Sequence, residues 1–185
     1  GRFGTISNSS KTPSRELSVT SMATIRAGSP RERALSMSDE HDGTPESGRL
    51  DRTTLETLAR RSETHPLVAS WAFTPDRLSP RALELTLDPS AYPPSVEAVR
   101  LDIHWFVTGD YYVHYVETRT ETRYQCRWDR HPKTNAPRTH IHPPPDAGEA
   151  EPSSVGTHHL DVLFEVLDWV SERVSTLHDA SRQSE

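Results

Sequence analysis

The segment that decides the fold runs from Val99 to His142 and reads VRLDIHWFVTGDYYVHYVETRTETRYQCRWDRHPKTNAPRTHIH. It holds most of the chain's aromatic residues. Turn-forming residues at 108–110 and a polar run at 119–122 divide its first part into strands. The predicted strands are 99–107, 111–118 and 123–129. Because both connections are short, we expect these strands to form an antiparallel meander.

The two-residue period of a strand divides these side chains between two faces. If Thr108–Asp110 form a three-residue loop, one face carries Leu101, Ile103, Trp105, Val107, Tyr111, Val113 and Tyr115. A loop of two or four residues within Arg119–Thr122 adds Tyr124, Cys126 and Trp128 to this apolar face. The other face then carries Asp102, His104, Tyr112, His114, Arg127 and Asp129. On this register His104, His114 and Arg127 lie in a row across three neighbouring strands.

The second strong signal is an apolar stripe at helical spacing near the C-terminus. Its members are Leu160, Leu163, Leu167, Val170, Val174 and Leu177. A stripe this wide has to be covered, and the aromatic face of the meander is the one candidate of sufficient size. We therefore predict an α+β fold, in which an antiparallel meander of three to five strands is covered on one face by this helix and by a shorter N-terminal helix. A helix seam that mediates dimerisation is the alternative.

Weaker signals precede the meander. The spacing of apolar residues predicts a short amphipathic helix over 51–64, with Asp51 or Thr53 as its N-cap. Residues 67–73 fit either a buried strand or a continuation of that helix. Residues 82–87 are predicted to form an edge strand, and three prolines exclude a strand from 88–95.

The chain is predicted to contain a single folded domain over 51–178, in which 143–155 form a mobile loop. Residues 1–50 lack any apolar period and are expected to be a disordered extension, and 179–185 a disordered tail. Met37 is a natural translation start, which would make the preceding residues an upstream extension. With no signal peptide and no apolar run of about 20 residues, we expect a cytoplasmic protein that does not enter a membrane.

Charge and cysteine content restrict the possible sites. Cys126 is the single cysteine and alternates with apolar residues, so we expect a buried thiol, no disulfide and no cysteine-based zinc site. The net charge is −6, yet residues 119–142 carry six basic and two acidic side chains. A basic island on an acidic protein directs anionic ligands to one region. Nineteen arginines against two lysines are typical of a salt-adapted organism such as a halophilic archaeon.

Three short motifs follow one another along the central segment. They are Tyr112-Val113-His114-Tyr115, Cys126-Arg127-Trp128-Asp129-Arg130-His131-Pro132 and Arg138-Thr139-His140-Ile141-His142-Pro143. Over about Val99–His142 this series resembles the TumE family of toxin–antitoxin toxins. The chain differs in its long N-terminal region and in the prolines around its His-x-His motif. The resemblance implies a toxin that acts on RNA, or at least inhibits growth, and a cognate antitoxin as partner.

The same residues suit metal-independent RNA cleavage, which needs a base, an acid and a cation beside the phosphate. His114 with His104 or His131 would form the proton-transfer pair, and Arg127 would hold the phosphate. Tyr112 would supply an orienting hydroxyl or a surface for base stacking. The candidates for nucleic-acid binding are Arg119, Arg123, Arg130, Lys133 and Arg138. No cofactor is expected.

Two other interpretations stay open. His140 and His142, together with His131 or His114, would suit Zn²⁺ or Ni²⁺, although their spacing matches no strong zinc signature. Alternatively, the basic island docks nucleic acid or an acidic protein without catalysis. Removing histidines separates these classes, because an enzyme then loses activity with binding retained, whereas a binding module depends mainly on its arginines.

Overall fold

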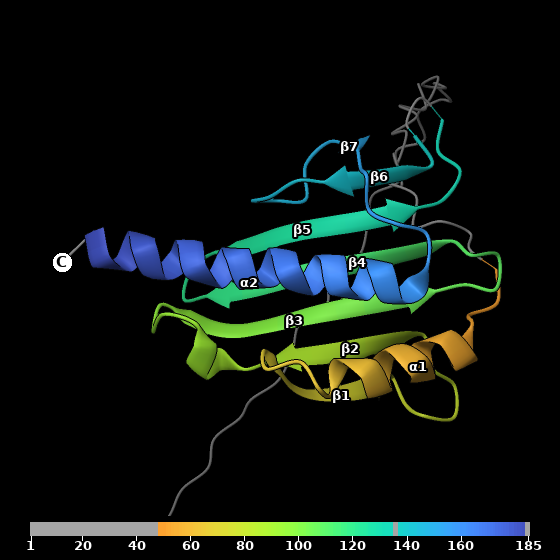
Figure 1. Cartoon of the computed structure of the whole chain (residues 1–185), viewed down its shortest axis with the longest axis horizontal. Helices are drawn as coiled ribbons and strands as arrows, with labels where there is room; N and C mark the ends of the chain where they lie inside the picture. Colours follow the sequence, from red (N-terminus) through yellow and green to blue (C-terminus); the bar gives the residue numbers. More distant parts are fainter. Residues whose placement is uncertain (1–47, 135–136, 184–185) are drawn as a thin grey trace, which may run out of the picture. The chain divides into compact units, whose positions relative to one another are not determined.

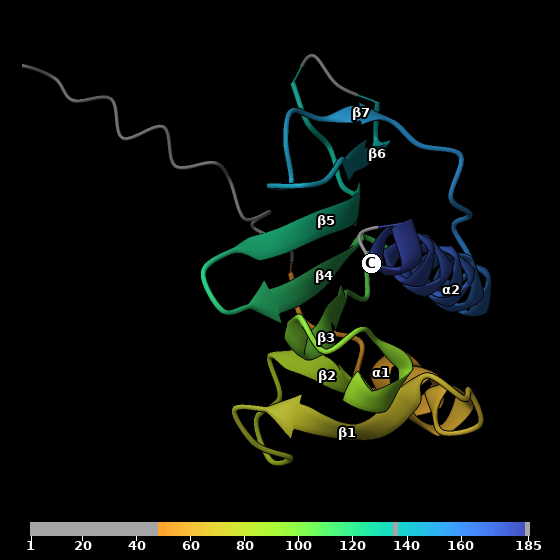
Figure 2. The same cartoon turned by 90° about the vertical axis from the view of Figure 1, so that its left-hand side faces the viewer.

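Seven strands form one antiparallel sheet in which every strand pairs with its neighbour along the chain (Figure 1). The computed structural model describes residues 48–134 and 137–183. The elements are α1 (Arg52–Ser62), β1 (Val68–Thr74), β2 (Ala82–Leu87), η1 (Pro89–Ala91), β3 (Val96–Trp105), β4 (Tyr111–Arg119), β5 (Arg123–Arg130), β6 (Thr139–His142), β7 (Glu151–Pro152) and α2 (His159–Gln183). Both α-helices lie on the same face of the sheet (Figure 2). This is the α+β class expected from the sequence.

The central three strands have the predicted faces. Trp105 pairs with Tyr111 and Ile103 with Val113, and Val113 in turn pairs with Trp128. The connection between β3 and β4 spans residues 106–110, two residues longer than predicted. Because both loop lengths are odd, the same side chains share a face in either case. Val107 is the exception: it follows the end of β3 and is 58% exposed, so its predicted place on the apolar face was wrong.

The sheet has seven strands, whereas three to five were predicted. β2 pairs with both β1 and β3, so its assignment as an edge strand was wrong. β6 pairs with β5 through His140 and His142. β6 arises in a segment for which no strand was predicted, and β7 in the segment that was assigned to a mobile loop. These two strands have four and two residues, too few to show the alternation by which strands are recognised.

The ends of the domain also differ from the sequence analysis. Residues 1–47 of the predicted disordered extension lie outside the described residues. The backbone N–H of Val107 donates to the carbonyl of Arg49 at 3.0 Å, and Leu50 bridges to Phe106, so the ordered chain begins before Asp51. Helix α2 includes residues 179–183, which the sequence analysis assigned to a tail. No helix in the described ranges is long and apolar enough to cross a membrane.

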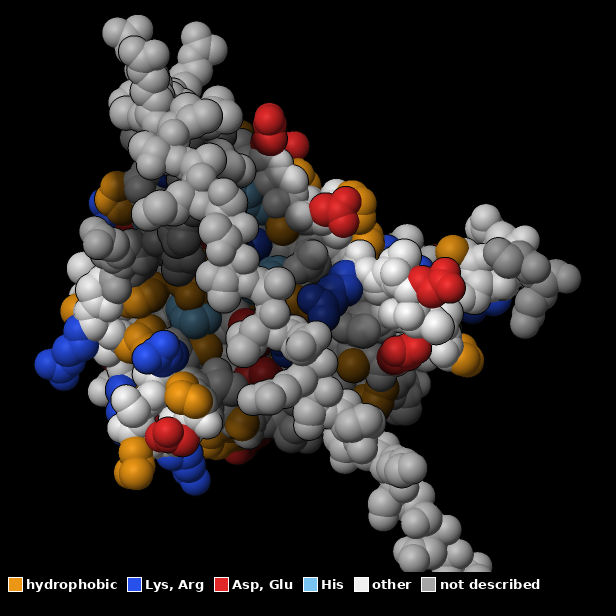
Figure 3. All heavy atoms as spheres, turned by 180° about the vertical axis from the view of Figure 1, so that it is seen from behind, with side chains coloured by type: hydrophobic (Ala, Val, Ile, Leu, Met, Phe, Trp, Pro, Cys, Tyr) orange, Lys and Arg blue, Asp and Glu red, His pale blue; other side chains and the backbone are white. Residues whose placement is uncertain are grey.

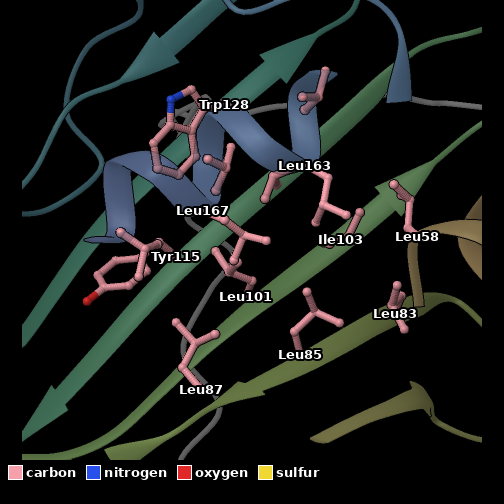
Figure 4. Close-up of a cluster of buried hydrophobic side chains, with 14 of the residues drawn as sticks. Leu58, Leu83, Leu85, Leu87, Leu101, Ile103, Tyr115, Trp128, Leu163 and Leu167 are labelled. Atoms are coloured by element: carbon pink, nitrogen blue, oxygen red, sulfur yellow. The ribbon is translucent and has the colours of Figure 1, made fainter. Parts of the chain in front are cut away.

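The core lies between the sheet and α2. Figure 4 shows Leu163 and Leu167 of α2 directed toward Leu101 and Ile103 of β3, with Trp128 of β5 beside them. Leu167 is fully buried, as are Leu101 and Tyr115. Trp169 meets the rings of Tyr115 and Trp128 edge-on, with centroids 5.2 and 5.0 Å away. The helix therefore covers the aromatic face of the meander, as predicted.

A buried carboxylate fixes the orientation of α2. Glu117 of β4 is fully buried, and the Nε of Arg173 on α2 donates to its Oε2 at 3.0 Å. Arg119 donates to Oε1 and the hydroxyl of Tyr115 to Oε2. Burial alone would raise the pKa of Glu117, but the two guanidinium groups outweigh it and hold that pKa below its usual value. An ionised Glu117 thus ties the helix to the sheet.

Leu167→Asp is expected to unfold the domain, because it places an unpaired charge in the fully buried centre of the helix–sheet interface. We expect a loss of more than about 4 kcal/mol of unfolding free energy. Phe164→Asp is the matched control, since Phe164 lies on the same helix and is 42% exposed. Urea unfolding followed by circular dichroism measures both. If Leu167→Asp is as stable as Phe164→Asp, the described packing of α2 is incorrect.

Candidate functional site

The sheet face away from the helices carries two rows of polar side chains. One row runs Asp102, His114, Arg127, His142 across β3 to β6, and the other runs His104, Tyr112, Asp129, His140. Figure 3 views this side of the molecule and shows histidines among acidic and basic side chains. The predicted neighbours His114 and Arg127 are thus direct cross-strand partners.

His104 does not lie in the row of His114 and Arg127, contrary to the predicted register. A three-residue loop would have paired His104 with His114. Because the loop has five residues, the pairing moves by two positions, and Asp102 becomes the partner of His114 while His104 faces Tyr112. The rings of His104 and Tyr112 stack with their centroids 3.9 Å apart. His104 therefore remains on the same face but belongs to the neighbouring row, opposite Tyr112 and two residues away from the row of His114.

An open groove of about 430 Å³ lies over β2, β3 and β4 on this face. Its lining includes the three predicted residues His104, Tyr112 and His114. Three charged side chains of the lining were not singled out by the sequence analysis, namely Arg81, Glu84 and Arg100, whereas Asp102 was placed on this face without a role. Arg100 shares the strand parity of Asp102 and His104, so the pattern contained that signal. Arg81 lies just before β2, where no periodicity marks it.

Burial favours the neutral forms of His104, Tyr112 and His114 in the groove. Burial lowers the pKa of His114, and the Asp102 carboxylate offsets part of this effect. Burial likewise lowers the pKa of His104 to about 4 and raises that of Tyr112 to about 12. At neutral pH both imidazoles can accept a proton, whereas the phenol retains its own. The Asp102 carboxylate itself accepts from Arg100 Nε at 3.0 Å.

Asp129 is the centre of a second, buried cluster beside the groove. Only 1% of its surface is exposed, and Arg127 Nε donates to Oδ1 and Oδ2 at 3.1 and 3.0 Å. Arg127 Nη2 also lies 3.1 Å from Nε2 of His142. The predicted phosphate-holding arginine is therefore engaged by an internal carboxylate and is partly covered, with 27% of its side chain exposed.

Three histidines surround the same carboxylate. The Nε2 atoms of His131, His140 and His142 lie 3.6, 3.6 and 3.4 Å from Asp129 Oδ2. All three rings are buried, and burial lowers the pKa of His140. Possible ligand atoms of Asp129, His140 and His142 all lie within 4.8 Å of one another, a separation that allows a shared metal ion. His131, which the sequence analysis offered as a proton-transfer partner of His114, belongs to this cluster and is not part of the groove lining.

The basic island does not form one patch. Arg119 turns to the helix side and pairs with Glu117, and Arg138 pairs with Asp110 at 2.6 Å. Arg130 contacts the hydroxyl of Thr139 at 3.3 Å, on the opposite face from Arg127 and Asp129. Arg123 is exposed at the start of β5, and Lys133 lies half-buried after β5. The alternation of β5 separates neighbouring basic residues onto different faces, which a count along the sequence does not reveal.

Comparison with known protein families shows to which family this domain is similar. The family model described as toxin TumE matches residues 55–174, a range that includes both the groove and the Asp129 cluster. No curated protein and no solved structure matches the chain significantly.

Asp129→Asn is expected to destabilise the domain by about 3 kcal/mol, because it leaves the guanidinium of Arg127 without its buried counter-charge. The free energy of unfolding is measured with urea in the presence of a chelator, so that no bound metal ion contributes to the stability of the cluster. Asp146→Asn serves as control, since Asp146 is exposed in the segment after β6. Equal stability of the two variants would show that the Arg127–Asp129 pair contributes nothing.

Proposed function

Because the chain belongs to the TumE toxin family, we propose that it inhibits growth by cleaving RNA in the groove over β2 to β4, and that a cognate antitoxin holds it in check. The observation that carries the proposal is the position of His114. This imidazole lies in the groove lining, with Asp102 on one neighbouring strand and Arg127 on the other. A base between an orienting carboxylate and a cation suits attack by a ribose 2′-hydroxyl on its phosphate.

His114 is the proposed general base. Its lowered pKa keeps the imidazole neutral at physiological pH, so a lone pair is present to accept the 2′-hydroxyl proton. Asp102 stabilises the imidazolium that forms. Histidine and carboxylate on adjacent antiparallel strands have Cβ atoms separated by about 5 Å, close enough for this support.

Tyr112 is the proposed proton donor to the departing 5′-oxygen. Its pKa of about 12 keeps the phenol protonated, and the neutral ring of His104 stacked against it fixes its orientation. The two arginines of the groove lining, Arg81 and Arg100, are the proposed phosphate contacts, and Arg127 lies beside His114 on β5. Glu84 and Asp102 balance the charge of Arg81 and Arg100, so we expect contacts at short range and little long-range attraction of RNA.

His114→Ala should abolish growth inhibition and lower the rate of RNA cleavage by a factor of about 10² to 10⁴, the usual effect of removing a general base. Binding of a short RNA, measured by fluorescence anisotropy, should stay within a few-fold of the parent. His158→Ala is the matched control, because that side chain is 58% exposed and lies just before α2. A His114→Ala protein as toxic as the His158→Ala protein would refute the role of His114.

If the protein is a non-catalytic binding module, the arginine matters and the histidine does not. In that case Arg100→Gln weakens RNA binding and toxicity together, while His114→Ala changes neither. In the enzyme, Arg100→Gln lowers both affinity and turnover, since a phosphate contact acts in the ground state and more strongly in the transition state. Measuring both properties for both variants separates the two functions.

The pH profile provides an independent check of the base. A neutral His114 is required, so log kcat/KM should fall only as the pH drops through a pKa below 6.5, the unperturbed value. Asp102→Asn removes the charge that raises this pKa, so the acidic limb should move to still lower pH. An acidic limb above pH 6.5, or one that Asp102→Asn shifts upward, would contradict the assignment.

A further inference from the structure

We propose that Asp129, His131, His140 and His142 form a closed four-ligand site for a divalent transition-metal ion, Zn²⁺, which fastens strand β6 to β5. This site is separate from the proposed reaction in the groove. The ion has a structural role, and the RNA chemistry described above does not involve it.

The orientation of the three imidazoles supports the site. Each Nδ1 faces a backbone carbonyl, that of Pro132 for His131, Pro137 for His140 and Gly148 for His142, at 3.0, 3.0 and 2.7 Å. A carbonyl oxygen can only accept, so in the neutral rings Nδ1 carries the hydrogen and Nε2 the lone pair. Metal-binding histidines are typically held in this way by a hydrogen bond from the nitrogen that does not ligate.

The three lone pairs then converge on one carboxylate oxygen. Nε2 of His140 is buried and has no hydrogen-bond partner in the part of the chain that the structure describes. It lies 3.6 Å from Asp129 Oδ2, an atom that can only accept when ionised. Acceptors facing one another inside a protein repel unless a cation lies between them. Asp129, His140 and His142 therefore already have the arrangement of a cation site, and His131 lies beside them.

Three of the six ligand separations fit a tetrahedral ion. Nε2 of His131 has to move toward the other two histidines to complete it, because among the described residues the ligand atoms within 4.8 Å of one another belong to Asp129, His140 and His142. Ligand atoms about 2.0 to 2.1 Å from a tetrahedral zinc ion lie about 3.3 to 3.5 Å apart. In the structure the three nitrogens lie 3.4 to 3.6 Å from the shared oxygen. Neighbouring ligands of an octahedral Mg²⁺ would be only about 3.0 Å apart, and that ion prefers oxygen. Three nitrogens and one oxygen favour Zn²⁺.

The burial of the four side chains indicates a structural ion. Their exposed fractions are 1% for Asp129 and 6, 0 and 4% for His131, His140 and His142. Four protein ligands without a place for water are typical of structural zinc, whereas catalytic zinc keeps an open position. β6 has only four residues and lies near the edge of the sheet, so its pairing with β5 alone gives little stability. Two of the four ligands come from this strand.

Arg127 competes with the ion for one ligand. Its Nη2 contacts His142 Nε2, and that contact has to open when His142 binds the metal. The Nε contact to Asp129 Oδ1 can remain, because the metal uses Oδ2. Removing the guanidinium therefore leaves all four ligands in place and removes a positive charge beside the ion.

The experiment uses the full-length chain, freed of metal with a chelator and titrated with Zn²⁺ and with Co²⁺. We expect one equivalent to bind, the thermal midpoint to rise by about 5 °C at saturating Zn²⁺, and Co²⁺ to give the intense visible absorption of a tetrahedral complex. Absence of binding by the unaltered protein, or a weak octahedral Co²⁺ spectrum, overturns the proposal. This outcome does not depend on whether any variant folds.

Variants locate the site. His140→Ala should weaken Zn²⁺ binding by at least about 100-fold, whereas His178→Ala, an exposed histidine on α2, should leave it unchanged. Arg127→Gln should bind Zn²⁺ at least as tightly as the parent. Equal loss in His140→Ala and His178→Ala, or loss of the ion in Arg127→Gln, contradicts the assignment. Zinc binding by a His114→Ala protein tests this site alone, so failure of the proposed RNA cleavage and failure of the metal site are told apart.

Discussion

The pleat of β4 is the constraint on which the rest of the structure depends, because its alternate side chains belong to two different environments. Tyr111, Val113 and Tyr115 point into the core beneath α2, and Tyr112 and His114 point to the groove. A slip of one residue would exchange the two sets and bury an imidazole among aromatic rings. The hydrophobic burial under α2 therefore also holds the groove residues in place. Stability and the candidate site have a common origin in this one strand.

The same alternation explains which features of the sheet could be predicted from the sequence. Hydrophobic alternation predicted the two faces of β3 to β5 correctly, since any odd loop between β3 and β4 preserves them. It could not predict which residues face each other, because loops of three and five residues have the same parity. The longer loop gives His114 the carboxylate of Asp102 as partner and leaves His104 with Tyr112. β6 was missed for a different reason: within its four residues Ile141 is the single apolar side chain, and prolines follow it.

Two buried carboxylates, one on each face of the sheet, hold elements together: Glu117 joins the sheet to α2, and Asp129 joins β5 to β6. Glu117 and Asp129 each accept from an arginine two residues away on the same strand, Arg119 and Arg127. Glu117 then binds α2 through Arg173, and Asp129 faces the histidines of β6. Burying a carboxylate is unfavourable unless cations and hydrogen-bond donors compensate its charge. Each carboxylate therefore holds several side chains around it. In the sequence these residues look like ordinary charged positions, since their partners come from distant elements.

The histidines of this face divide into two groups by what surrounds each ring. A group that transfers a proton during a reaction has to exchange it with substrate and solvent, which requires at least partial access. His104 and His114 line an open groove and are partly exposed, although Nε2 of His114 is itself buried and has no hydrogen-bond partner among the described residues. His131, His140 and His142 are buried, with Nδ1 fixed by backbone carbonyls and Nε2 directed at one carboxylate. These are the rings of the proposed metal site. Because Arg127 contacts Asp129 and His142 and also pairs with His114 across the strands, it lies at the boundary between the two groups, and a change in the buried cluster would alter the charge beside the groove.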